Sequence, residues 1–178
     1  MGYFNAVHGW PSFDAITESA QFTGTIPAGR VVTKNGSTGK FELAGNADPA
    51  ARVPYIAITD STDLDVAKVD NDASLYPNSL QAVAAAGTSG GNLPTLALSQ
   101  AIEFDTDQFL GTPAAGQNLT FYGVASGETT AASLGKLRVA ASGEPIVARC
   151  TKASAALREL PGVTVIRVIA AAYGQLAA

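Results

Sequence analysis

The sequence has little of what chemical sites are usually built from. Among its 178 residues there is one cysteine, Cys150, and one histidine, His8. A single cysteine cannot form a disulfide within the chain, and no Cys/His spacing typical of a zinc site exists. A lone histidine in an irregular segment gives no basis for a Ser/His/Asp set. We therefore expect a protein that is not an enzyme, without cofactor or metal, in which Cys150 is a small buried hydrophobe.

Charge is scarce as well. Charged residues make up 15% of the chain, against roughly 25% in an average soluble domain. The net charge is -4, and the lysines and arginines form no cluster, so the basic groove that a nucleic-acid partner requires is not expected. No apolar run reaches the ~18 residues of a membrane span. The first residues lack the basic and apolar regions of a signal peptide, so neither a membrane nor secretion is expected.

What the sequence does have is small residues. Hydrophobic residues make up 47% of the chain, and many of them are alanine. Surface positions must then be filled largely by Ala, Gly, Ser, Thr and Asn. Such a surface favours contact with other protein, although a domain with a simple bias toward small residues would look the same.

Short runs with a strand pattern alternate with turn residues. "GRVVT", "KFELA" and "VPYIAITD" read as strands, and "KNGSTG" between the first two supplies a turn through Asn35-Gly36. "GVTVIRVIAAAYG" near the end is apolar on both faces, which indicates a central or covered strand. The pattern predicts an all-β fold, an antiparallel β-barrel or a β-tulip or sandwich, with at most one or two short helices. The best helix candidate is "SLQAVAAAG" at 79–87.

Two β-units of similar sequence occur, at about 26–66 and 112–153. Ala28-Gly29 matches Ala115-Gly116, "VVTK" matches "NLTF", and "GKFELA" from Gly39 matches "GKLRVA" from Gly135. The fourth match is "PYIA" at 54–57 with "PIVA" at 145–148. The units predict similar strand–turn–strand–loop–strand elements with Phe41 and Leu137 in comparable cores. They leave open whether these are two barrels or halves of one.

Residues 1–22 are expected to form an extended N-terminal arm beside a β-rich body over 23–178. The segment carries four aromatic residues without a clear period, and these are the candidate interface residues: Tyr3, Phe4, Trp10 and Phe13. Exposing four aromatics would favour aggregation, so they should be docked. They either cover the open end of the chain's own body or reach across a neighbouring subunit.

Acidic residues fall in two groups. The loop 60–72 holds five aspartates, which are Asp60, Asp63, Asp65, Asp70 and Asp72. Oxygen-rich loops suit Ca²⁺, but the EF-hand pattern fails here, and a solvated acidic loop is the simpler interpretation. Glu103, Asp105 and Asp107 alternate, so they should form the polar face of a strand that could meet a basic partner.

Together these phrases resemble a known family. "PAGRVVTKNGSTGKFELA…VPYIAITDS" and "FDTDQFLGTPAAGQNLTF…LGKLRVAASGEPIVARCT" look like tailed-bacteriophage capsid decoration (cement) proteins and related small head proteins, over roughly residues 22–170. The resemblance implies a β-barrel or β-tulip body docked on the outside of a capsid. It implies the major capsid protein as partner, self-association as a dimer or trimer, and a place on the virion surface after assembly in the host cytoplasm.

Two other functions fit the same pattern. One is a different virion component, such as a tail, baseplate or head-fibre part. The other is a carbohydrate-binding or carbohydrate-active β-barrel, although a glycosidase needs two carboxylates opposed across a cleft, which the sequence alone cannot place. Binding to capsids would distinguish a capsid decoration protein from both of these alternatives.

Overall fold

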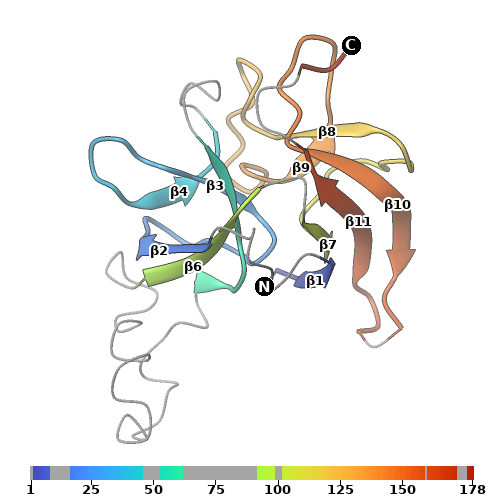
Figure 1. The fold of residues 1–178 in the computed structure, drawn as a ribbon, viewed down its shortest axis with the longest axis horizontal. Coiled ribbons are helices and arrows are strands. Elements are labelled where there is room, and N and C mark those ends of the chain that lie inside the picture. Colours follow the sequence, from blue (N-terminus) through green and yellow to red (C-terminus); the bar gives the residue numbers. More distant parts are fainter. Residues whose placement is uncertain are drawn as a thin grey trace, which may run out of the picture.

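The fold is all-β, as the sequence predicts. The computed structural model describes residues 2–8, 17–45, 53–61, 92–98, 102–158, 160–171 and 176–178. In this part of the chain eleven strands form two antiparallel sheets (Figure 1). The sheets are not closed into barrels, so the sandwich alternative fits. The helix expected at 79–87 lies outside the described residues.

The first sheet contains five strands in the order β2-β6-β5-β3-β4. Their bounds are β2 Thr17–Gln21, β3 Val31–Lys34, β4 Phe41–Leu43, β5 Pro54–Ala57 and β6 Asn92–Ala97. The β3–β4 hairpin forms where Asn35-Gly36 was expected to turn the chain: Asn35 Oδ1 accepts the backbone N–H groups of Ser37 and Thr38. Gly39 closes the turn with a positive φ of 68°.

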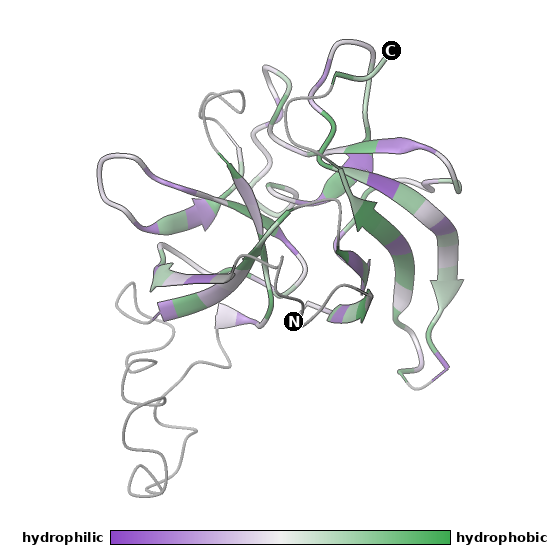
Figure 2. Ribbon diagram, viewed as in Figure 1, coloured by the Kyte–Doolittle hydropathy of each residue, from purple (hydrophilic) through white to green (hydrophobic). Residues whose placement is uncertain are grey.

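The second sheet contains six strands in the order β1-β7-β11-β10-β8-β9. Their bounds are β1 Phe4–His8, β7 Glu103–Thr106, β8 Asn118–Phe121, β9 Leu137–Val139, β10 Ala148–Ala156 and β11 Thr164–Ala170. The strand expected to be central is β11, and it lies between β7 and β10. Figure 2 shows it hydrophobic along most of its length.

The two sheets repeat one strand order. Reading β2, β6, β5, β3 and β4 of the first sheet against β7, β11, β10, β8 and β9 of the second pairs the strands in the same sequence order and with the same antiparallel neighbours. Of the eleven strands in the described residues, β1 is left over, at the edge of the second sheet. We call residues 17–98 unit 1 and residues 102–171 unit 2. The repeat is therefore larger than the sequence matches indicated.

Register fixes which residues correspond. Val32 lies opposite Leu43 and Tyr55 in unit 1, and Leu119 lies opposite Val139 and Ala148 in unit 2. The matches of "VVTK" with "NLTF" and of "GKFELA" with "GKLRVA" therefore hold. The match of "PYIA" with "PIVA" is wrong by two residues, because Ala148 corresponds to Tyr55 and Val147 to Pro54.

The turns before β3 and β8 contain the same backbone hydrogen bond. The N–H of Gly29 donates to the Ala57 carbonyl at 2.8 Å, and the N–H of Gly116 donates to the Cys150 carbonyl at 2.8 Å. Both glycines have a positive φ, 78° and 90°. Single parallel bridges, Phe22 with Phe41 and Phe109 with Leu137, join the chain after the first strand of each unit to its last strand.

The core lies mainly between the sheets. One cluster draws on both units, with Val31, Ile56 and Leu96 meeting Phe104 and Leu119. A smaller cluster around Phe22, Phe41 and Leu93 belongs to unit 1 alone. Phe41 and Leu137 are both fully buried, so the expectation that both point into a core is confirmed. Burying apolar area on this scale is the main driving force for the fold.

The N-terminal segment is extended, but its described residues are paired strands of the two sheets. β1 pairs with β7 of the second sheet, and β2 pairs with β6 of the first. Residues 2–8 and 17–22 therefore belong to the body that was expected to begin at residue 23.

Candidate functional site

A polar junction built around Gly2 and Tyr3, directly before β1, connects residues of the two units. The N–H of Gly2 donates to both carboxylate oxygens of Asp60, at 2.9 and 3.1 Å, and the N–H of Ala28 donates to Asp60 Oδ1 at 2.8 Å. A side chain at position 2 would have no room, because its Cβ would lie 2.2 Å from the Ala28 carbonyl oxygen. Asp60 is thus buried and holds the residues before the N-terminal strand through hydrogen bonds. The interpretation as a solvated loop is wrong for this residue.

Unit 2 holds the next residue in the same way. The N–H of Tyr3 donates to Asp107 Oδ1 at 2.8 Å, and the side-chain amide of Gln108 donates to the same oxygen at 2.7 Å. The carboxylates of Asp60 and Asp107, one from each unit, therefore grip consecutive residues of one strand. Charged acceptors make such hydrogen bonds stronger than neutral ones.

Arg30 completes the junction from the unit 1 side. Its Nε donates to Gln108 Oε1 at 2.8 Å, and its Nη1 and Nη2 donate to the carbonyls of Leu134 and Ala132 at 2.9 and 2.8 Å. All three acceptors belong to unit 2, and Arg30 itself is only 8% exposed. Burial lowers the pKa of the guanidinium, and the nearby charge of Asp107 opposes that shift. The guanidinium fork thus joins the two units.

Among the four candidate interface aromatics, Phe4 has a ring contact in the described residues. Phe4 packs against Phe104 with ring centroids 5.4 Å apart and contacts the main core cluster. Tyr3 is half-buried at the junction. Trp10 and Phe13 lie outside the described residues. For all four aromatics the interface hypothesis stays a prediction.

The acidic face expected on "EFDTDQ" is occupied from within the chain. Asp105 accepts two hydrogen bonds from Arg167, at 2.8 and 2.9 Å, and Glu103 accepts the Thr151 hydroxyl at 2.9 Å. The hydrogen bond to Asp105 raises the pKa of Arg167 further. These carboxylates therefore stabilise unit 2 rather than forming an open polar face.

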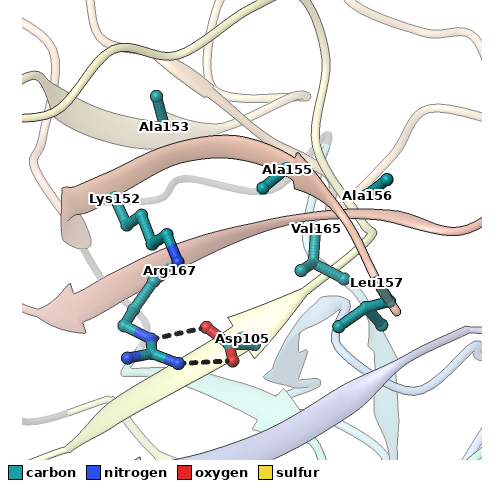
Figure 3. Close-up of a pocket in the computed structure, with 8 residues that line it drawn as sticks. All are labelled: Asp105, Lys152, Ala153, Ala155, Ala156, Leu157, Val165 and Arg167. Carbon is teal, nitrogen blue, oxygen red and sulfur yellow. Dashed lines mark hydrogen bonds and ion pairs between the residues drawn. The ribbon is translucent and has the colours of Figure 1, made fainter. Parts of the chain in front are cut away.

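The hairpin of β10 and β11 is exposed along the outer part of β10. Figure 1 shows it extending past the neighbouring strands as a curved ribbon. β10 pairs with β8 only at Ala148 and Arg149, and beyond Cys150 it pairs with β11 alone. Two register shifts between Cys150 and Ala155 bend it. One face holds a hollow of about 110 Å³ lined by alanines, Leu157 and Val165, with Lys152 and the Arg167–Asp105 pair at its edge (Figure 3).

A second ion cluster braces the loops of unit 2. Arg138 donates to both oxygens of Glu144, at 2.6 and 2.7 Å, and to Glu128 at 3.0 Å. Its Nε also lies 2.7 Å from Glu128 Oε1, close enough for an ion pair but not aligned for a hydrogen bond. The Arg138 hydrogen bonds lower the pKa of Glu144. Burial opposes the same change at Glu128, where Arg138 and two backbone N–H groups still leave the pKa lowered.

The described residues offer few groups for chemistry. Among them no set of three or more His, Cys, Asp and Glu side chains could hold a metal ion. Cys150 is buried, as expected, and burial raises the pKa of its thiol, which disfavours the reactive thiolate. In the same part of the chain no helix is long and apolar enough to cross a membrane.

No family model, curated protein or solved structure matches this chain. The site is therefore argued from its geometry alone. Sequence reasoning missed Arg30 and Gln108. When the units are aligned from Phe22 and Phe109, "FTGT" matches "FLGT", and Arg30 takes the place of Gln117 directly after the Ala-Gly pair that both turns share. An arginine in place of a glutamine at that point was the available signal for Arg30, whereas Gln108 matches Gln21 and gave none.

Proposed function

We propose that this protein is a structural component of a bacteriophage virion, which binds the outer surface of the capsid and stabilises it by bridging neighbouring capsomers. Its partners are the major capsid protein and further copies of itself. The observation that carries the proposal is the presence of two five-stranded units with one strand order in a single chain.

Two related units fixed to each other give one molecule two related surfaces. A body of this kind can contact two neighbouring subunits at once, and linked contacts hold far more firmly than either contact alone. The junction of Arg30, Asp60 and Asp107 keeps the units in one orientation. A bridge between capsomers needs that stiffness, because a loose linker would let each contact dissociate separately.

The composition supports the same role. A surface with few charges loses little solvation when it is covered by another protein, and small side chains allow close approach. The sequence resemblance to capsid decoration proteins points the same way, since the phrases that carry it form β3, β4, β5 and β7 to β10.

The test is binding to capsids that lack the protein. Purified protein mixed with such capsids should sediment with them to a fixed stoichiometry and raise the temperature at which the shells break. A protein that does not sediment with capsids but does bind tails or baseplates would move the function to another virion component. Turnover or tight binding of a polysaccharide, without capsid binding, would favour the carbohydrate-directed function.

A further inference from the structure

The two units meet through opposite faces of their sheets. Ile56 and Leu96 of the first sheet lie in the main core cluster between the units, and the strand register makes Arg149 and Ile169 their equivalents in the second sheet. Neither equivalent is among the residues of that cluster, and Arg149 is exposed. A head-to-tail contact of this kind uses equivalent surfaces differently. The outer face of the second sheet, which points away from the core, is therefore the counterpart of the face that unit 2 covers on unit 1.

A hollow lies on this outer face, along the β10–β11 hairpin. Successive residues of a strand point to opposite faces of the sheet, and Ile166 and Val168 of β11 lie in the main core cluster. Val165 and Arg167 therefore lie on the outer face, where they line the hollow of about 110 Å³ together with alanines of β10 and Leu157 (Figure 3). A closed cavity of about 150 Å³ holds a benzene ring, so this hollow has the size to take one apolar side chain.

The rim of the hollow carries a positive charge that the described residues do not balance. Lys152 lies opposite Arg167 in the strand register, and like charges that face each other across a strand pair are destabilising. Asp105 balances Arg167 through hydrogen bonds of 2.8 and 2.9 Å. Lys152 is exposed and forms no ion pair with any residue in the described ranges. A carboxylate from outside the chain would neutralise the remaining charge.

We propose that this hollow is a docking site for a polypeptide segment of a partner protein, in which one apolar side chain fills the hollow and a neighbouring carboxylate pairs with Lys152. A polypeptide is the occupant that the fold favours, because the equivalent face of unit 1 is covered by protein. The apolar side chain would contribute burial, and the complementary charge would fix the orientation of the segment. The proposal does not depend on capsid binding.

Because the partner is defined by its chemistry, the experiment begins with a random peptide library displayed on yeast. The full chain is the bait, and no capsid is present. The selected sequences should share an apolar residue with Asp or Glu beside it. The most enriched sequence, made as a synthetic peptide, is then the probe for titration calorimetry at low salt and at about 1 M salt, where screening acts within about 3 Å. Its affinity should fall at least tenfold at high salt.

Two variants separate the charge from the hollow. Lys152→Glu should weaken binding of the probe at least tenfold, and Ala155→Leu, which fills the hollow, should do the same without a change of charge. The matched controls are Lys136→Glu, directly before β9, and Ala131→Leu, in an exposed turn, and both should bind as wild type does. A probe with lysines in place of its acidic residues should bind Lys152→Glu better than wild type. Circular dichroism checks the sheets of each variant, and Ala153→Leu takes the place of Ala155→Leu if that variant does not fold.

Three results would overturn the proposal. A selection that enriches no sequence, or enriches basic or uncharged ones, means that the hairpin has no partner of this chemistry. A probe that binds the charge variant and the filled variant as tightly as wild type is held elsewhere on the protein. A probe whose affinity falls equally in these variants and in their matched controls responds to net charge or to added bulk, and not to this site. Capsid binding can succeed or fail independently in every case.

Discussion

The two units share a strand order but differ where they meet other structure. In unit 1, the chain after β5 turns inward, and Asp60 and Ser61 accept backbone N–H groups of Gly2, Ala28 and Ile26. In unit 2, the corresponding strand β10 runs on for nine residues into an exposed hairpin. Two units with one strand order can therefore differ in role. In unit 1 the segment after β5 stabilises the body, and in unit 2 the equivalent strand is exposed and free to contact a partner.

A second difference concerns the turn before β3 in unit 1 and before β8 in unit 2. Arg30 of unit 1 reaches across to three acceptors of unit 2, whereas the side chain of the equivalent Gln117 is exposed and accepts the nearby N–H of Ala114, at 2.7 Å. The strand order is common to both units, but the junction is one-sided. Changes at equivalent positions should then have unequal effects, which allows each unit to serve as the control for the other.

Removing residues 1–8 should have the largest effect. The deletion strips β1 from β7, takes the Phe4 ring from the core, and removes the Gly2 N–H from Asp60 and the Tyr3 N–H from Asp107. Loss of a buried aromatic and of buried hydrogen bonds together should lower the free energy of unfolding by about 4 kcal/mol or more. Urea unfolding measures this loss. A truncated protein that unfolds like the full chain but no longer binds capsids would instead identify the segment as an assembly element.

Arg30→Ala should come next. It leaves the carbonyls of Ala132 and Leu134 and the Gln108 side chain without their donor, so we expect a loss of about 2–4 kcal/mol. Gln117→Ala, the matched change in unit 2, should cost less than about 0.5 kcal/mol, as an exposed substitution usually does. Equal losses in the two variants, measured by urea unfolding, would mean that Arg30 does not join the units.

Gly29→Ala and Gly116→Ala form a pair of equivalent backbone positions. Both need a positive φ, which costs an alanine about 1 kcal/mol or more. At Gly29 the new Cβ would also lie 2.3 Å from Thr106 Oγ1 and 2.5 Å from the Tyr3 carbonyl oxygen, whereas at Gly116 nothing lies within 4 Å. The Gly29 variant should lose at least twice as much stability as the Gly116 variant in thermal unfolding.

The inverse pair checks that reasoning. Gly39 of unit 1 is open, but a Cβ at its equivalent, Gly135, would lie 2.4 Å from the Val31 carbonyl oxygen. Here the unit 2 alanine variant should be the less stable one. If the variants of the same unit are the less stable ones in both glycine pairs, close contacts of the added Cβ are not the cause.

Acid should produce the smallest of these effects, and mostly in unit 2. The pKa values of Glu128 and Glu144 are lowered in the folded protein from the ordinary 4.5. Their stabilising contribution is then complete above about pH 4.5 and is lost as the pH falls toward the folded values. The free energy of unfolding, followed by urea titration, should decline below pH 4.5 and decline less in Arg138→Gln. An ion pair of unit 1, Lys34 with Glu18, is more exposed and should matter less.

Local pattern predicted the strands well because turn residues and alternation act over a few residues. Asn35-Gly36 and the alternation of "KFELA" identify the β3–β4 hairpin, and the apolar character of β11 on both faces identifies a central strand. The repeat was recognised only in part. Leu93, Thr95 and Ala97 of β6 share a pattern of burial with Ile166, Val168 and Ala170 of β11, but they share few residue types.

Register and long-range contacts were beyond the sequence for a physical reason. A shared proline and alanine aligned "PYIA" with "PIVA" in the sequence. The pairing with β3 and β8 shows that the true alignment lies two residues away. Pro54 has no N–H to donate, while its counterpart Val147 donates to the Leu119 carbonyl at 2.9 Å. The partners of Arg30 are 78 to 104 residues away, a separation that no local pattern encodes.

The pairing of β1 with β7 also sets an order of events during synthesis. Strands β2 to β6 can pair among themselves once residue 98 has left the ribosome, but residues 2–8 must wait for a partner about a hundred residues later, as the 104-residue separation of Tyr3 and Asp107 shows. At ordinary translation rates that delay lasts roughly 5–20 s. For that time Phe4 has no ring to pack against, and the first strand made is among the last to be placed. Slowing translation between β6 and β7 would lengthen the interval in which a chaperone, or a second nascent chain, can capture it.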